Sequence, residues 1–251
     1  MHIKIQIDLT ATVFHCLVFA VQLSTLIYDV LYLHNGLKGE GLDFIVWSTI
    51  NYRGFPGKFK HLTFWCQIIQ TVYFGFCLFN DIYGSNVKPW DNPKRRHNLQ
   101  GIRDKFFSAI AFPLGMFVVL TFWGIYAVDR DLIYPEHLDK IIPSWLNHIM
   151  HTTVLPFLLL EQFFVYHHYP KRTKGLLITF TFAAVYLAWI LWIAYHVNLW
   201  VYPVLEVLDI KGKVMFFAGL LGMLAVIYLI GEVVNKAFWG SPAKQAMSKI
   251  K

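Results

Sequence analysis

The sequence has few charged residues, and this scarcity excludes an ordinary soluble domain. Asp, Glu, Lys and Arg make up 15% of the 251 residues, whereas 57% are hydrophobic and 18% are aromatic. The mean hydropathy is +0.48. A typical soluble domain has about 25% charged residues. The composition therefore predicts an integral membrane protein.

Cysteine is also scarce, and no compact metal-binding motif is present. Cys16, Cys66 and Cys77 all lie in apolar segments without CxxC spacing, a pattern typical of packing residues. No HExxH motif occurs in the sequence. We therefore expect no disulfide framework, no metal and no cofactor.

Acidic residues are fewer than basic ones, 15 against 22, and the net charge is +7. An excess of this kind can indicate nucleic-acid binding. Here, however, the basic residues lie in short loops beside apolar segments, where anionic lipid headgroups attract them. We expect membrane lipids, and not nucleic acid, as the partners of these residues.

Six apolar stretches are long enough to cross a bilayer core, which takes about 20 residues of helix. Because they are continuous apolar runs, they favour helices over the alternating strands of a β-barrel. The predicted architecture is an all-α bundle of six transmembrane helices, with residues 1–251 forming a single membrane-embedded domain. The predicted spans are residues 9–33, 62–84, 105–128, 144–166, 176–196 and 214–238.

The distribution of positive charge predicts the orientation of the bundle. Of the 22 Lys and Arg, 14 lie on the side that holds both termini. Since cytoplasmic loops are enriched in these residues, both termini are predicted to be cytosolic. The stretch 44–50 is too short to span and is expected to lie at the interface or to cover a cavity mouth. The plasma membrane and the endoplasmic reticulum both remain open as locations.

Polar side chains follow one face of two predicted helices. On the second, Thr63, Gln67 and Gln70 are spaced at i, i+4 and i+7, which predicts that they point into the bundle. Hydrogen bonding between helices is the simplest role for such a stripe. The sixth predicted helix carries a second stripe, made of Tyr228, Glu232 and Asn235.

The fourth predicted helix begins with a cluster of polar residues. Asn147 and His151 are four residues apart, so the Asn147 amide could orient one ring nitrogen of His151 while the other faces a substrate. Alternatively, His148 and His151 bridge helices or bind a metal with distant ligands. The candidates for those ligands are Glu161, His167, His168 and His196.

The predicted topology brings two of these residues toward the same level of the membrane. The second and fourth predicted helices both enter from the non-cytosolic side. With a rise of about 1.5 Å per residue, His151 lies roughly 10 Å below its predicted helix start and Thr63 lies almost at its own. The two side chains could therefore meet.

Several segments resemble, in order, the androgen-induced and androgen-dependent TFPI-regulating protein family. The run WLNHIMHT within 142–152 is the most specific, whereas the first 60 residues match little. The resemblance implies an intramembrane threonine hydrolase of fatty acid esters of hydroxy fatty acids, with Thr63 as nucleophile and His151 as its partner. The segments are 61–64, 103–104 with 111–113, 129–135, 142–152, 200–203 and 228–232.

The implied chemistry is covalent catalysis on a lipid ester that enters from the bilayer. His151 would remove the hydroxyl proton of Thr63, which attacks the ester carbonyl, and water later releases the acyl group. Asn147, His148 and Thr152 are candidates for contacting the substrate or the oxyanion, by proximity alone. The loops differ from those of better-known family members, which leaves the substrate range and the paralogue open.

Three other classes of function remain as alternatives. A non-catalytic, multi-pass membrane regulator is the most serious, because the family name itself records a regulatory effect. A His-ligated, metal-dependent membrane enzyme is the second. A transporter is the third, although the sequence lacks the repeat symmetry and paired interrupted helices expected of one.

Overall fold

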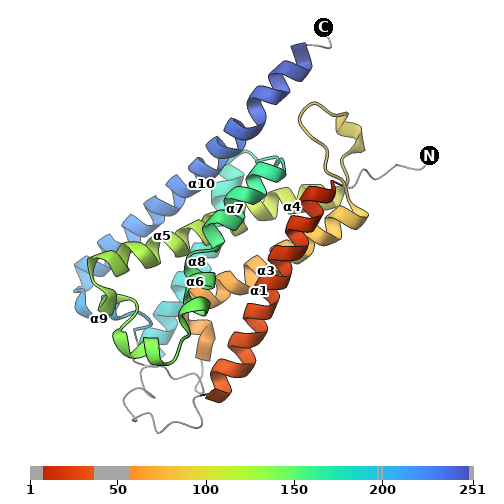
Figure 1. Cartoon of the computed structure of the whole chain (residues 1–251). Helices are drawn as coiled ribbons and strands as arrows, with labels where there is room; N and C mark the ends of the chain where they lie inside the picture. Colours follow the sequence, from red (N-terminus) through yellow and green to blue (C-terminus); the bar gives the residue numbers. More distant parts are fainter. Residues whose placement is uncertain (1–7, 37–56, 197, 199, 249–251) are drawn as a thin grey trace.

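The computed structural model describes residues 8–36, 57–196, 198 and 200–248, and all regular structure among them is helical (Figure 1). The predicted all-α membrane class is confirmed. The predicted interfacial stretch 44–50 lies outside the described residues. Within them, five helical segments are long and apolar enough to cross a membrane: Leu9–Leu31, Leu62–Tyr83, Asn98–Val128, Arg172–His196 and Ile210–Gly240.

The helices pack into one bundle in which neighbours in space are often distant in sequence. Helix α1 packs along α3, and α10 packs along α5. Helix α1 begins and α10 ends toward the same side of the bundle (Figure 1). The helices are α1 (Leu9–Gly36), α3 (Leu62–Tyr83), α4 (Asn98–Phe106), α5 (Phe112–Val128), α6 (Ser144–His151), α7 (Val154–Phe164), α8 (Arg172–His196), α9 (Pro203–Val207) and α10 (Ile210–Ser248).

The predicted continuous helix over 144–166 is wrong, because α6 and α7 are separated by a break at Thr152 and Thr153. The cause is Pro156, which has no N–H to donate and whose ring clashes with the carbonyl of residue 152. The Leu155 N–H donates to the Thr152 carbonyl (3.3 Å) and not to that of residue 151. The sequence contained this signal in Pro156.

A second proline shapes the span that contains α4 and α5. Pro113 follows a single π-helical turn, Phe107–Ala111, and cannot donate to the carbonyl of Ala109. The Thr179 hydroxyl of α8 donates to that carbonyl instead (2.7 Å). The Gln70 amide of α3 donates to the nearby Ala111 carbonyl (2.8 Å). Side chains of two other helices thus satisfy backbone groups at this turn.

Helices α8 and α10 present most of their apolar side chains outward. In the most apolar 18-residue stretch of each helix, only 22% is buried inside the protein. Leu177 and Val185 on α8, and Val226 and Val233 on α10, are more than half exposed. In a membrane protein such side chains face lipid, since hydrocarbon is as favourable a surrounding for them as a protein core. These helices therefore form an outer, lipid-facing surface of the bundle.

Gly115 on α5 sits at the closest approach of three helices and provides a test of the packing. A Cβ at this position would lie 2.5 Å from Leu158 Cδ1, 2.7 Å from Gln70 Nε2 and 2.9 Å from Val154 Cγ1. We expect Gly115→Ala to destabilise the bundle by about 1–3 kcal/mol because these neighbours must move. Gly124→Ala, where nothing lies within 4 Å, should cause no loss. The stability of both variants is measured as the midpoint of thermal unfolding in detergent. Equal midpoints for the two variants would contradict the close packing around Gly115.

Candidate active site

The structure brings Thr63 and His151 together, although 88 residues separate them in the sequence. Thr63 is the second residue of α3 and His151 is the last residue of α6. The Thr63 Oγ1 lies 3.1 Å from the His151 Nε2, within hydrogen-bond distance. His151 is buried, at 6% exposed. The arrangement is that of a hydroxyl beside a nitrogen base.

The other ring nitrogen of His151 fixes the orientation of the imidazole. Its Nδ1 lies 3.0 Å from the backbone carbonyl of Asn147, which can only accept a hydrogen bond. Nδ1 must therefore carry the proton, and Nε2 is left as an acceptor for the Thr63 hydroxyl. Phe122 stacks on the ring at 3.7 Å between centroids and limits its rotation.

The interpretation that the Asn147 side-chain amide orients His151 is wrong in its atom, because the backbone carbonyl does so. An i, i+4 spacing brings either the side chain or the carbonyl of residue i near residue i+4, so the spacing alone could not distinguish them. The Asn147 side chain is itself buried, at 8% exposed, and its Oδ1 has no hydrogen-bond partner among the described residues.

His148 and Thr152 lie on a different side of the helix from His151. The His148 Nδ1 and the Thr152 hydroxyl are 3.1 Å apart, and both residues are exposed. The Trp123 indole donates to the Thr152 hydroxyl (3.2 Å) and to the His151 carbonyl (2.8 Å), which the helix break leaves free. Neither residue lines the two described cavities that meet at Thr63.

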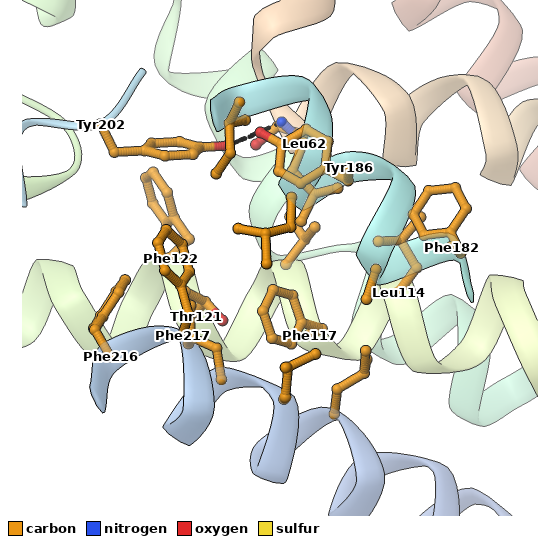
Figure 2. A pocket seen from close by; sticks show the side chains of 18 of the residues that line it. Leu62, Leu114, Phe117, Thr121, Phe122, Phe182, Tyr186, Tyr202, Phe216 and Phe217 are labelled. Atoms are coloured by element: carbon orange, nitrogen blue, oxygen red, sulfur yellow. Dashed lines mark hydrogen bonds between the residues drawn. The ribbon is translucent and has the colours of Figure 1, made fainter. Parts of the chain in front are cut away.

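The first of these cavities lies within the bundle, has a volume of about 140 Å³ and is almost entirely apolar. Figure 2 shows Leu114 and Phe117 of α5 on one side and Phe216 and Phe217 of α10 on another. Thr63 lies in its wall. The cavity has the lining that a hydrocarbon chain requires.

A second cavity of about 150 Å³ adjoins the first and is more polar. Both Thr63 and His151 line it. The loop between α5 and α6 contributes Tyr134, whose pKa is raised to about 12 by burial, so its hydroxyl remains protonated at neutral pH. The remaining polar residues in its wall are Asp29, Lys58, His61, His137 and Tyr202.

Two tyrosines hold the beginning of α3, and thus Thr63, in place. The Leu62 N–H, one of the donors that has no partner within its own helix, donates to the Tyr202 hydroxyl (2.9 Å). The Tyr186 hydroxyl lies 3.0 Å from that of Tyr202 and donates to the Lys60 carbonyl (2.9 Å). The dashed lines in Figure 2 mark hydrogen bonds of this network.

The two polar stripes point into the bundle, as predicted. Gln67 and Gln70 are 2% and 0% exposed, and the Gln67 amide donates to the Gln22 carbonyl of α1 (3.0 Å). On α10, Glu232 pairs with Arg172 of α8 at 2.7 Å. Both stripes therefore connect helices, and Thr63 belongs to one of them.

Two of the residues considered for a metal site with His148 and His151, namely Glu161 and His167, belong to a different group of side chains. His148 faces Thr152, whereas His151 faces Thr63. Glu161 and His167 lie near each other, with 3.2 Å between the Glu161 Oε1 and the His167 Nε2. Their partner in space is His15 of α1, 2.7 Å from Glu161, and this is a separate cluster.

The fold and this site define a multi-pass α-helical membrane protein in which a threonine hydroxyl lies beside a buried histidine. The family model for the FAR-17a/AIG1-like protein matches residues 10–236, and the chain belongs to this family. The human androgen-induced gene 1 protein is 39% identical over 204 residues, covering 80% of this chain and 86% of that protein. These matches confirm the resemblance found in the sequence.

A second relative is the human androgen-dependent TFPI-regulating protein. It is 37% identical over 183 residues, which cover 73% of this chain and 78% of that protein. The mouse protein of the same name is 37% identical over 193 residues, with 77% and 82% covered. No solved structure matches the chain.

Several residues that shape the site carried no chemical signal in the sequence. In the sequence, Phe122 and Trp123 are ordinary members of an apolar run. In the structure, Phe122 stacks on the His151 ring, and the Trp123 indole donates to the His151 carbonyl. Tyr202 lies in the segment 200–203 that resembles the family, which marked its location but not its role. Contacts of this kind depend on how helices pack.

The tautomer of His151 is open to direct measurement. We expect ¹⁵N NMR of the imidazole to show a protonated Nδ1 and an unprotonated Nε2, because the carbonyl of Asn147 can only accept. The pattern should persist in Asn147→Ala, which retains that carbonyl. A proton on Nε2 in the wild type, or a tautomer change in Asn147→Ala, would contradict the assignment.

Proposed function

We propose that the protein is an intramembrane hydrolase that cleaves fatty acid esters of hydroxy fatty acids, with Thr63 as nucleophile and His151 as base. The observation that carries this proposal is the 3.1 Å contact between the Thr63 Oγ1 and the His151 Nε2, at the junction of two cavities. A nucleophile beside a base that is itself oriented by a third group is the arrangement needed for covalent catalysis.

The reaction begins with proton transfer from the Thr63 hydroxyl to the His151 Nε2. The Thr63 Oγ1 bonds to the ester carbonyl carbon, and the resulting tetrahedral intermediate expels the alkoxide of the hydroxy fatty acid, which takes the proton from His151. Water then attacks the acyl-Thr63, giving a proton to His151, and the fatty acid leaves as Thr63 regains its proton. Each step is complete without a metal or cofactor.

The position of Thr63 also favours stabilisation of the developing negative charge. As the second residue of α3, Thr63 lies at a helix amino terminus, where the helix dipole attracts anions. The hydrogen bond from Leu62 to Tyr202 holds this first turn in place. An oxyanion formed on a carbonyl attacked by Thr63 would face this positive end.

A two-chain ester suits the pair of cavities better than a single-chain ester. Thr63 lines both, so an ester carbonyl at Thr63 can place one chain in the apolar cavity and the other in the more polar one. The second cavity contains His61 and His137, whose ring N–H groups can donate to a substrate carboxylate, and Lys58, which is paired with Asp29 of the same cavity at 2.7 Å. Its polarity also gives water a route to the acyl-Thr63.

The nucleophile and base are tested with paired variants in the purified protein. We expect Thr63→Ala and His151→Ala each to lower hydrolysis of such an ester by about 10²-fold or more, since nucleophile and base act as a unit. Thr63→Ala should also abolish covalent labelling by a fluorophosphonate. Thr63→Ser, which keeps the hydroxyl, should retain part of the ester hydrolysis and part of the fluorophosphonate labelling.

The matched controls are Thr71→Ala on the same helix and His148→Ala on the same short helix as His151. Thr71 donates only to the Gln67 carbonyl, and His148 faces away from Thr63. Both variants should hydrolyse at close to the wild-type rate. An inert but monodisperse wild type would sink the enzyme proposal and favour a non-catalytic membrane regulator. If a chelator abolishes hydrolysis while Thr63→Ala and His151→Ala do not, a metal-dependent enzyme is favoured.

The apolar cavity predicts a dependence on acyl-chain length. Ala183 lines this cavity, whereas its neighbour Ala184 is exposed on the outer face of α8. We expect Ala183→Phe to raise KM for long-chain esters about tenfold while sparing short-chain esters, because the new ring occupies chain-binding space. Ala184→Phe should leave both unchanged. An equal effect of Ala183→Phe on all chain lengths would place the acyl chain elsewhere.

A further inference from the structure

The more polar of the two cavities beside Thr63 has two imidazoles in its wall that are not engaged elsewhere. They belong to His61, directly before α3, and His137, in the loop between α5 and α6. His61 is the N-cap residue of α3, yet its side chain makes no cap hydrogen bond. Neither ring has a hydrogen-bond partner among the residues that the structure describes. Each ring therefore has an N–H that is available to a ligand.

A buried positive charge without a counter-charge lies next to His61. Lys60 is 2% exposed and forms no ion pair with any described residue. Lys58, by contrast, is paired with Asp29 in the cavity wall at 2.7 Å. Burying a charge without a partner is costly. An anion bound near Lys60 would offset this cost.

The charge of Lys60 acts on the His61 ring. Burial lowers the pKa of His61 to about 3, and the positive charge of Lys60 contributes in the same direction. The His61 ring is therefore neutral at neutral pH and keeps one N–H donor. A donor that lies in a positive potential favours a negatively charged acceptor.

The rest of the cavity restricts this acceptor to the end of an apolar chain. The cavity has a volume of about 150 Å³, and it shares Thr63, Phe122, Ile133 and Tyr202 with the apolar cavity. A small inorganic anion would leave the apolar part of this wall uncovered, whereas a hydrocarbon chain would cover it. The apolar residues that line only the polar cavity are Phe64, Leu138, Ile142, Met150 and Val201, with Pro135 and Pro203.

We propose that the polar cavity binds the free carboxylate of a fatty acid chain, with the ring N–H groups of His61 and His137 as donors and Lys60 as the source of positive potential. This inference deepens the proposed function and rests on it for the orientation of the ester. The hydroxy fatty acid half of the substrate occupies the polar cavity, and its acyl chain occupies the apolar one.

The orientation follows from the order of residues along the chain. His61 and Thr63 are two residues apart and line the same cavity, so a carboxylate at His61 and an ester at Thr63 belong to one substrate molecule. After the reaction, the hydroxy fatty acid would still hold its carboxylate at His61. The site therefore selects esters with a free carboxylate over neutral esters, and it retains the hydroxy fatty acid product.

The test is direct binding of tritiated hydroxystearic acid to the full-length protein purified in detergent. Unlabelled hydroxystearic acid should displace the label, and its primary amide should compete at least about tenfold less well. The amide has the same chain but no charge, so the difference reports recognition of the carboxylate. Hydrogen bonds to charged groups are strong enough for a difference of this size.

Two variants test the residues that recognise the carboxylate. We expect His61→Phe, which keeps a ring but loses the N–H, to weaken binding of the acid about tenfold and to remove most of the preference over the amide. His61→Gln, which keeps a donor, should recover part of it. Lys60→Met should reduce the same preference by several-fold, because it removes the charge and keeps a chain of similar length.

The matched controls are His148→Phe and Lys140→Met. His148 is exposed and lines neither cavity, and Lys140 is an exposed lysine of the loop between α5 and α6. Both variants should bind the acid as the wild type does. Each variant is compared only as a monodisperse species in size-exclusion chromatography.

Three results would overturn the carboxylate site. The first is equal competition by the acid and the amide in the wild type. The second is an unchanged preference for the acid in monodisperse His61→Phe. The third is displacement of the label by phosphatidylserine as strongly as by the acid, which would make the cavity a site for phospholipid headgroups.

The binding readout separates this inference from the proposed hydrolase. A wild type that binds the acid with the expected preference but cleaves no ester keeps the carboxylate site and loses the proposed function. A wild type that cleaves an ester with a free carboxylate and the corresponding amide-ended ester at equal kcat/KM keeps the hydrolase and loses the site.

Discussion

Backbone carbonyls released inside the bilayer are the constraint on which this bundle depends. Water cannot satisfy them in hydrocarbon, so other parts of the protein must. Pro113 leaves the Ala109 carbonyl without its helical donor, and Thr179 of α8 supplies one. The break before Pro156 releases the His151 carbonyl, and Trp123 of α5 donates to it. These bonds fix the positions of three helices relative to one another.

The same break creates the candidate active site. A continuous helix over 144–166 would place His151 in mid-helix, whereas ending α6 at His151 sets its ring between Phe122 and Thr63. Thr63 itself lies at the first turn of α3, where the helix dipole concentrates positive potential. A proline that ends one helix and the amino terminus of another helix therefore meet at the candidate active site.

The two ends of α3 differ in their chemistry. At its beginning, Thr63 adjoins two cavities, one almost entirely apolar and one more polar. Toward its other end, Cys77 and Asp81 lie in a fully buried group of ionisable side chains drawn from four helical segments. Burying several charges together is costly unless they are paired or bound to a metal.

The resemblance to the family singled out Thr63 and His151, which no pattern within one helix distinguishes. The sequence by itself determined the membrane class and the polar faces of the helices. Composition and periodicity carry this information, because each helix must turn its polar side chains away from lipid. The tertiary structure decided which atom of Asn147 orients His151, that Phe122 stacks on the ring, and that His15 meets Glu161 across 146 residues. Periodicity describes one helix at a time, whereas these contacts depend on the packing and relative rotation of several helices, which no spacing within one segment specifies.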